Sequence, residues 1–185
     1  FCKELFTQYI PNQKLNMFLM FSIMMLYVAI LYLFGISLVT LKYLLLVPLL
    51  ISVLAIDFKE RIIPDRLILI LFEIGMVFSI IEGFDSLNIF VDKILGMIIG
   101  FGIFGLITLI GGLLTKKKAM GYGDVKLMAA LGLIFGEMGI LMIIVISFLI
   151  AAIVSIILLI IRKKKFTEYI AFGPYISVAS FILMM

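Results

Sequence analysis

Long apolar runs alternate with short polar connections along this chain, which is the pattern of helices that cross a membrane. A spanning helix needs about 20 apolar residues, and runs near that length follow one another from residue 17 onward. Charged residues and turn formers separate them. The pattern predicts an all-α fold, a polytopic membrane helical bundle of about six to seven transmembrane helices, forming a single membrane-embedded domain over residues 1–185. The expected spans are 17–35, 39–57, 66–82, 89–114, 125–137, 139–161 and 168–185.

Glycines mark two of these spans as sites of close helix packing. The run at 125–137 is short for a straight crossing, and its Gly132 and Gly136 allow another helix to approach. Gly96 and Gly100 form a G-x-x-x-G pattern in the fourth span. Small residues of this kind favour contact between membrane helices. We therefore expect these glycines to serve packing rather than chemistry.

The composition excludes several classes of protein and of active site. Hydrophobic residues make up 65% of the chain and charged residues 14%, against about 45–50% and about 25% in soluble domains. A soluble globular domain, a disordered chain and a disulfide scaffold are excluded. The single cysteine, Cys2, and the absence of histidine exclude Ser–His and Cys–His catalysis within this chain. Carboxylates and lysines are left for chemistry, and we expect no metal and no cofactor.

The basic residues predict how the chain is oriented in the membrane. The net charge of +4 is interpreted as a signal for orientation and for contact with lipid headgroups. We expect no nucleic acid partner. Because positive loops stay in the cytoplasm, we expect a cytoplasmic N-terminus. On the opposite side Glu82, Asp85 and Asp92 are interpreted as solvated acids, as is Glu60 on the cytoplasmic side. The basic connections carry Lys59, Arg61 and Arg66; Lys116, Lys117, Lys118 and Lys126; and Arg162, Lys163, Lys164 and Lys165.

Two acids at the predicted cytoplasmic boundary are candidates for function. Asp57 ends the second span, where the negative end of a helix disfavours a carboxylate. In the alternative interpretation, Asp57 is a solvated acid at the membrane boundary, and Lys59 and Arg61 offset its charge. Asp124 follows Gly121 and Gly123 at the start of the fifth span, where it is also a favourable helix N-cap. A G-x-G-D sequence at the mouth of a membrane helix is the more specific of the two signals.

Pro64 and Asp65 have mainly structural interpretations, whereas the role of Glu73 stays open. Pro64 prevents the second helix from continuing, and Asp65 is suited to cap the third. Contact with a substrate is the alternative for this pair. Glu73, inside the third span, either pairs with a lysine or faces an internal water-filled cavity.

If Asp57 and Asp124 meet, they can hydrolyse a peptide bond. Two carboxylates in hydrogen-bond reach share one proton. The ionised carboxylate takes a proton from water, which attacks the carbonyl, while the protonated one donates to the carbonyl oxygen. This chemistry needs no histidine, metal or covalent intermediate, so the composition permits it.

Three ordered motifs resemble the type IV prepilin peptidases. The segment AIDFKERIIPD (55–65) resembles their first aspartate motif, and AMGYGDVKLMAALGLIFG (119–136) closely resembles their G-x-G-D motif. The segment FGPYISVAS (172–180) resembles an F-G-P segment typical of their last span. The likeness extends from about residue 44 to the end of the chain.

The resemblance implies a bacterial inner-membrane aspartic endopeptidase of pilus or secretion systems. It would remove the basic leader of a prepilin or pseudopilin at the cytoplasmic face, with residues 1–185 as its peptidase domain. Asp57 and Asp124 would be the catalytic pair. The matching active-site loop comprises Gly121, Tyr122, Gly123 and Lys126, and Pro64 and Asp65 are expected as substrate contacts or structural residues.

One departure from the family pattern bears on a second activity. Many bacterial members carry paired C-x-x-C motifs in an N-terminal region that accompanies N-methylation, whereas Cys2 is the single cysteine here. The resemblance therefore implies a peptidase without methyltransferase activity, as either a short member or a truncated chain. Three other functions stay open. They are a presenilin-like intramembrane aspartic protease, a small ion-coupled transporter in which Asp57, Glu73 and Asp124 bind cations or protons, and a noncatalytic assembly subunit that would not need the two acids.

Overall fold

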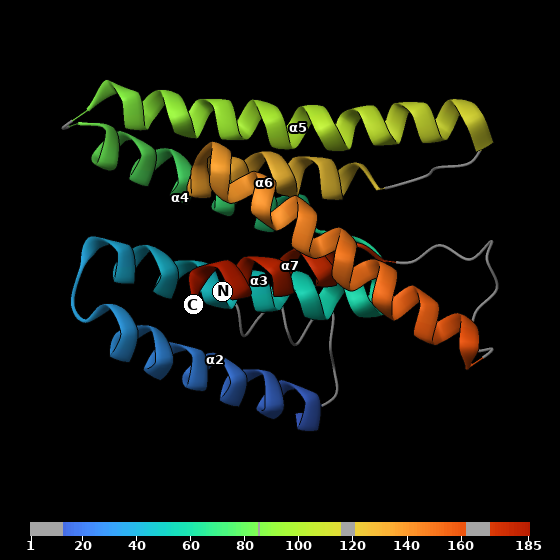
Figure 1. Ribbon diagram of the computed structural model, residues 1–185. Helices are drawn as coiled ribbons and strands as arrows, with labels where there is room; N and C mark the ends of the chain where they lie inside the picture. Colours follow the sequence, from blue (N-terminus) through green and yellow to red (C-terminus); the bar gives the residue numbers. More distant parts are fainter. Residues whose placement is uncertain (1–12, 85, 116–120, 162–170) are drawn as a thin grey trace.

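The computed structural model describes residues 13–84, 86–115, 121–161 and 171–185, which form a bundle of α-helices (Figure 1). These ranges contain no β-strand. The prediction of an all-α membrane bundle is confirmed. The helices are α2 (Gln13–Phe34), α3 (Leu38–Glu60), α4 (Asp65–Gly83), α5 (Leu87–Thr115), α6 (Tyr122–Ile160) and α7 (Gly173–Met184).

Four of the described helices, α2, α3, α5 and α6, are long and apolar enough to cross a membrane. Helix α7 is apolar but has 12 residues, and α4 carries charged side chains at both ends and in its middle. The chain is thus a multi-pass membrane protein by helix length and composition. The full number of six to seven crossings stays a prediction.

Helix α6 contains both the fifth and the sixth predicted spans. Its backbone leaves helical geometry at Gly136, where φ is 79° and ψ is −174°. Essentially only glycine adopts this combination. The first part of α6 runs from Tyr122 toward the α4–α5 turn, and the second part returns (Figure 1). The spans predicted at 125–137 and 139–161 are therefore joined directly, through one non-helical glycine.

Glycine contacts bring α5 and the first part of α6 close together. A Cβ added to Gly96 would lie 2.5 Å from the Gly132 carbonyl oxygen, and one added to Gly100 would lie 2.5 Å from the Met128 oxygen. No side chain fits at either position. The predicted packing function of Gly96 and Gly100 is confirmed.

The main hydrophobic core surrounds the first part of α6. It is made by residues of α3, α4, α5, α6 and α7, with α7 packed against both α3 and α6. Helix α2 lies at the edge of the bundle against α3 (Figure 1). The end of α3 and the start of α6 thereby come to the same end of the bundle. Fully buried core side chains include Leu50, Val53, Leu67, Leu127, Leu131 and Ile176.

Candidate active site

Asp57 lies in the last turn of α3 and is 4% exposed. A carboxylate is disfavoured there by the helix dipole. The contact that offsets this comes from α7, because the Gly173 backbone N–H donates a 2.9 Å hydrogen bond to Asp57 Oδ2. Gly173 is the first residue of α7, so the positive end of that helix faces the Asp57 carboxylate.

Asp124 lies in the first turn of α6 and is 3% exposed. The sequence predicted it as an alternative N-cap, but Gly121 occupies that position. The Asp124 carboxylate instead interacts with the backbone of Gly121, as the third helical residue does in a capping box. Its Oδ1 atom is buried and has no hydrogen-bond partner within the described ranges. That oxygen is an acceptor whose hydrogen-bonding capacity the described residues do not fill.

The structure brings Asp57 and Asp124 together. The two carboxylates lie close enough for the charge of Asp57 to influence Asp124, although the two positions are 67 apart in the sequence. Both side chains are buried, and the α7 terminus lies against one of them. Two neighbouring carboxylates removed from bulk water, one with an oxygen unpartnered among the described residues, are an arrangement that can carry out acid–base chemistry.

Gly173 is the site residue that the sequence did not assign. A Cβ at this position would lie 2.6 Å from Asp57 Oδ2, so a larger residue cannot occupy it without moving the carboxylate. The available signal was the F-G-P segment at 172–174, which resembles a segment typical of the family's last span but assigned Gly173 no contact.

The other predicted site residues lie around the carboxylate pair rather than in it. Lys126 Nζ forms an ion pair of 2.7 Å with Asp65 Oδ1, and both side chains are exposed. Tyr122 is also exposed, and Gly123 packs against Ile63. The capping function predicted for Asp65 is wrong, because Pro64 holds the N-cap position of α4 and Asp65 begins the helix.

Glu73 does not join this site. It lies on the exposed face of α4, and it forms neither an ion pair nor a hydrogen bond with the rest of the described chain. Glu60 is exposed and pairs with Lys59, as a solvated acid would. The predicted basic positions 116–118 and 162–165 and the acid Asp85 lie outside the described residues.

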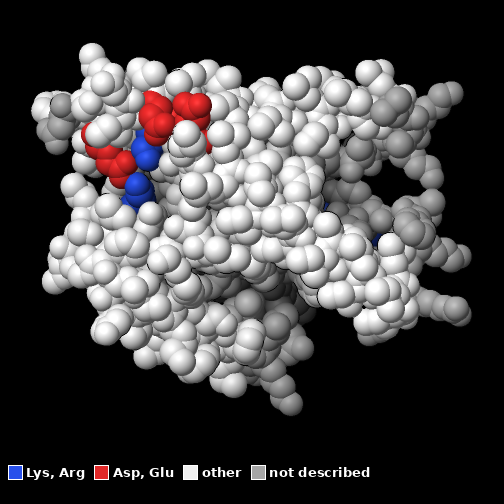
Figure 2. Space-filling model, in the orientation of Figure 1, with Lys and Arg blue, Asp and Glu red and all other residues white. Residues whose placement is uncertain are grey.

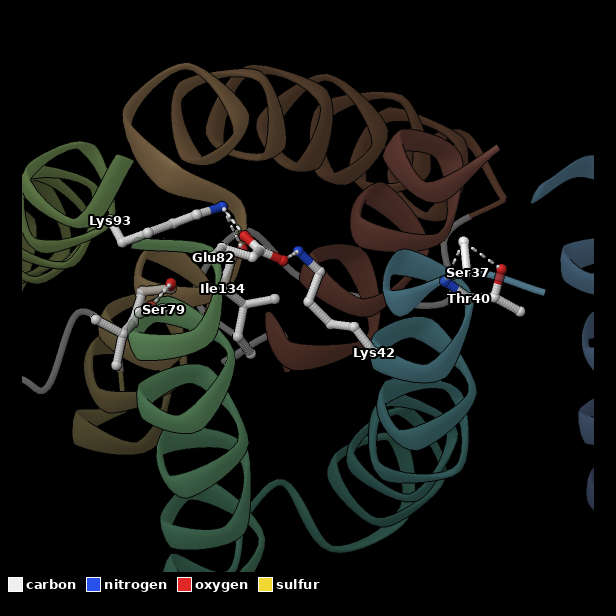
Figure 3. Close-up of polar contacts among 8 residues, drawn as sticks. Ser37, Thr40, Lys42, Ser79, Glu82, Lys93 and Ile134 are labelled. Atoms are coloured by element: carbon white, nitrogen blue, oxygen red, sulfur yellow. Dashed lines mark hydrogen bonds and ion pairs between the residues drawn. The ribbon is translucent and has the colours of Figure 1, made fainter. Parts of the chain in front are cut away.

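Two acids that the sequence interpreted as solvated are partly buried in a polar network. Glu82 pairs with Lys42 at 2.5 Å and with Lys93 at 3.3 Å (Figure 3). Asp92 accepts a hydrogen bond from the Glu137 backbone. The interpretation was wrong because the partners come from other helices: the lysines of α3 and α5 for Glu82, and the α6 backbone for Asp92. Lys42 lies about 22 Å along α3 from Asp57, so this network occupies the opposite end of the bundle.

In the described part of the chain, no three His, Cys, Asp or Glu side chains come close enough to hold a metal ion together.

Comparison with known proteins shows a family match over the segment that contains both carboxylates. A model of the type IV leader peptidase family matches residues 44–156, a segment that includes both Asp57 and Asp124. No solved structure matches the chain.

Curated relatives carry the same name in several bacteria, "Prepilin leader peptidase/N-methyltransferase". The Aeromonas hydrophila protein is 34% identical over 79% of this chain and 49% of its own length. The Neisseria gonorrhoeae protein is 33% identical over 81% of this chain and 50% of its own. The Escherichia coli K12 protein is 32% identical over 69% of this chain and 55% of its own.

The chain thus spans about half the length of the curated relatives that it matches. The family match covers more than half of this chain and contains the parts of α3 and α6 that carry Asp57 and Asp124. The chain belongs to the type IV leader peptidase family.

Proposed function

We propose that this protein is a membrane aspartic endopeptidase that removes the basic leader from type IV prepilins or pseudopilins. Membership of the type IV leader peptidase family supports the class of reaction. The observation that carries the proposal is the buried pair of Asp57 and Asp124 at one end of the bundle, with Asp124 Oδ1 unpartnered in the described chain.

In the proposed mechanism the two carboxylates share one proton and hold the attacking water. The ionised carboxylate accepts a proton as the water attacks the scissile carbonyl. The protonated carboxylate donates to the carbonyl oxygen, and the roles reverse as the amine leaves. The Gly173 N–H supports this step by holding Asp57 in one orientation through its 2.9 Å hydrogen bond.

We further propose that the carboxylate pair faces the cytoplasm from a bacterial inner membrane, within one peptidase domain over residues 1–185. Lys59, Arg61, Arg66 and Lys126 all lie at the end of the bundle that carries the pair. Positive charge at this end favours a cytoplasmic location and contact with anionic lipid headgroups. A leader rich in basic residues would meet the pair from that side.

Family membership favours peptide hydrolysis over the ion-coupled transporter. A transporter would use acids near the middle of the membrane, whereas Glu73 is exposed on α4 and makes no ion pair in the described chain. The presenilin-like alternative differs in where the substrate is cut, inside its apolar helix rather than just before it.

The test is incubation of the purified chain with a prepilin, followed by mass spectrometry of the products. We expect one cut between the basic leader and the apolar helix, no added methyl group, and the same rate with a metal chelator. A cut within the apolar helix would favour the presenilin-like alternative. Absence of cleavage by a folded protein that still binds the prepilin would contradict the proposal.

A further inference from the structure

The turn of α6 at Gly136 leaves backbone groups without helical partners. A helix end exposes carbonyl groups, and a helix start exposes N–H groups. In a membrane protein each such group costs several kcal/mol unless another group pairs with it. The two parts of α6 meet at Gly136 with no loop between them, so their partners must come from other helices.

Three side chains from α4 and α5 supply these partners. Ser79 donates to the Leu133 oxygen at 2.9 Å, and Lys93 donates to the Ile134 oxygen at 3.0 Å (Figure 3). Asp92 Oδ1 accepts from the Glu137 N–H at 3.2 Å. We call Ser79, Asp92 and Lys93 the break cluster. Together they pair with backbone groups on both sides of the turn.

The break cluster also connects the two helices that carry the carboxylate pair. Lys93 lies 3.3 Å from Glu82, and Glu82 pairs in turn with Lys42 of α3 (Figure 3). Lys42 and Lys93 are both buried, and a buried charge is stable only when it is paired. A continuous series of contacts therefore runs from α3 through α4 and α5 to the α6 backbone. Figure 2 shows charged side chains gathered at one end of an otherwise mostly uncharged face.

We propose that the break cluster is a positioning device, which sets the direction of the first part of α6 and so places Asp124 opposite Asp57. Asp124 precedes Gly136 by 12 residues, so a rotation of about 10° at the turn would move it by about 3 Å. A displacement of about 1 Å can cost a reaction about 100-fold. The cluster touches no reacting atom and acts only through the direction of α6.

The first test measures whether positions 57 and 124 lie close together, and it needs no substrate. In a Cys2→Ser background, Asp57→Cys and Asp124→Cys are introduced together and joined by a short bifunctional thiol reagent. We expect rapid cross-linking in this parent, and cross-linking several-fold slower when Lys93→Met or Asp92→Ala is added. Unchanged cross-linking in both variants, or no cross-linking in the parent, would overturn the proposal.

Matched variants separate positioning from general loss of structure. Asp92→Asn keeps an acceptor for the Glu137 N–H and should restore rapid cross-linking. Glu137→Gln removes one negative charge next to the turn, but the Glu137 side chain makes no hydrogen bond or ion pair with other described residues. This control should cross-link like the parent. If Lys93→Met does not fold, Ser79→Ala provides the milder change, and it too should slow cross-linking.

The second test uses cleavage and rests on the proposed function. Lys93→Met should lower kcat by about 10- to 100-fold while KM changes much less, because the break cluster does not contact substrate. A loss confined to KM would contradict positioning. Since cross-linking needs no cleavage, a failure of the proposed function would leave the first test intact.

Discussion

Asp57 shows how one side chain can be singled out by its position along a helix. A carboxylate at a helix C-terminus is unfavourable, and this alone makes Asp57 a candidate from the amino-acid sequence. Its compensating contact, the N–H of Gly173, lies 116 residues further along the chain. No local pattern connects the two residues, so the sequence predicted Asp57 as a site residue and missed Gly173.

We predict that Gly173→Ala abolishes most leader cleavage. The new Cβ would lie 2.6 Å from Asp57 Oδ2, so the carboxylate must move or its hydrogen bond must break. A loss of about 100-fold is expected for a displacement of about 1 Å, measured as kcat on a prepilin. Gly102→Ala is the control, because no atom lies within 4 Å of its added Cβ. Equal activity of the two variants would show that Gly173 does not position Asp57.

The Lys126–Asp65 pair should contribute little to stability and modestly to activity. Both side chains are largely exposed, and exposed ion pairs contribute about 0–1 kcal/mol. We predict that Asp65→Ala leaves the unfolding temperature in detergent almost unchanged and lowers the cleavage rate only in part. Complete loss of cleavage by folded Asp65→Ala would place this residue in the mechanism.

At the scale of elements, the sequence predicted where α6 turns but not which side chains hold the turn. The apolar pattern separated its two parts between 137 and 139, close to the observed turn at Gly136. The side chains that hold the turn come from α4 and α5. The hydropathy pattern predicted that Asp92 is solvated, whereas Asp92 accepts a hydrogen bond from the α6 backbone. The pattern along α5 could not show this, because it does not reveal which backbone groups of another helix lack a partner.

Contact between α5 and α6 should tolerate no added methyl group. We predict that Gly96→Ala destabilises the protein by about 1–3 kcal/mol, as overpacking does, because its Cβ would lie 2.5 Å from the Gly132 oxygen. Gly105→Ala, on the same helix with no atom within 4 Å, should be neutral or slightly stabilising. Thermal unfolding in detergent compares them, and similar unfolding temperatures would refute the close packing of α5 on α6.

At the scale of the whole molecule, alternating spans and charged connections predicted the membrane bundle and the end at which the two acids meet. The helices observed follow the predicted apolar runs, with α2 to α5 each matching one run. What the sequence lacked was the arrangement of these helices around α6, because the order of spans along a chain does not determine which of them touch.

The proposed orientation predicts opposite labelling of the two ends of the bundle. In a Cys2→Ser background, Glu60→Cys should react in intact cells only with membrane-permeant thiol reagents. Asn88→Cys, exposed in the first turn of α5 at the other end, should react with impermeant reagents as well. The reverse pattern would put the carboxylate pair outside the cytoplasm.

The most direct test of the central claim compares leader cleavage by Asp57→Asn, Asp124→Asn and the double variant, each verified as folded. If the two carboxylates act as one unit, each single variant should lose more than about 1,000-fold in kcat, and the double variant should be no worse. Substantial cleavage by either folded single variant, or losses that multiply in the double variant, would contradict a shared catalytic pair.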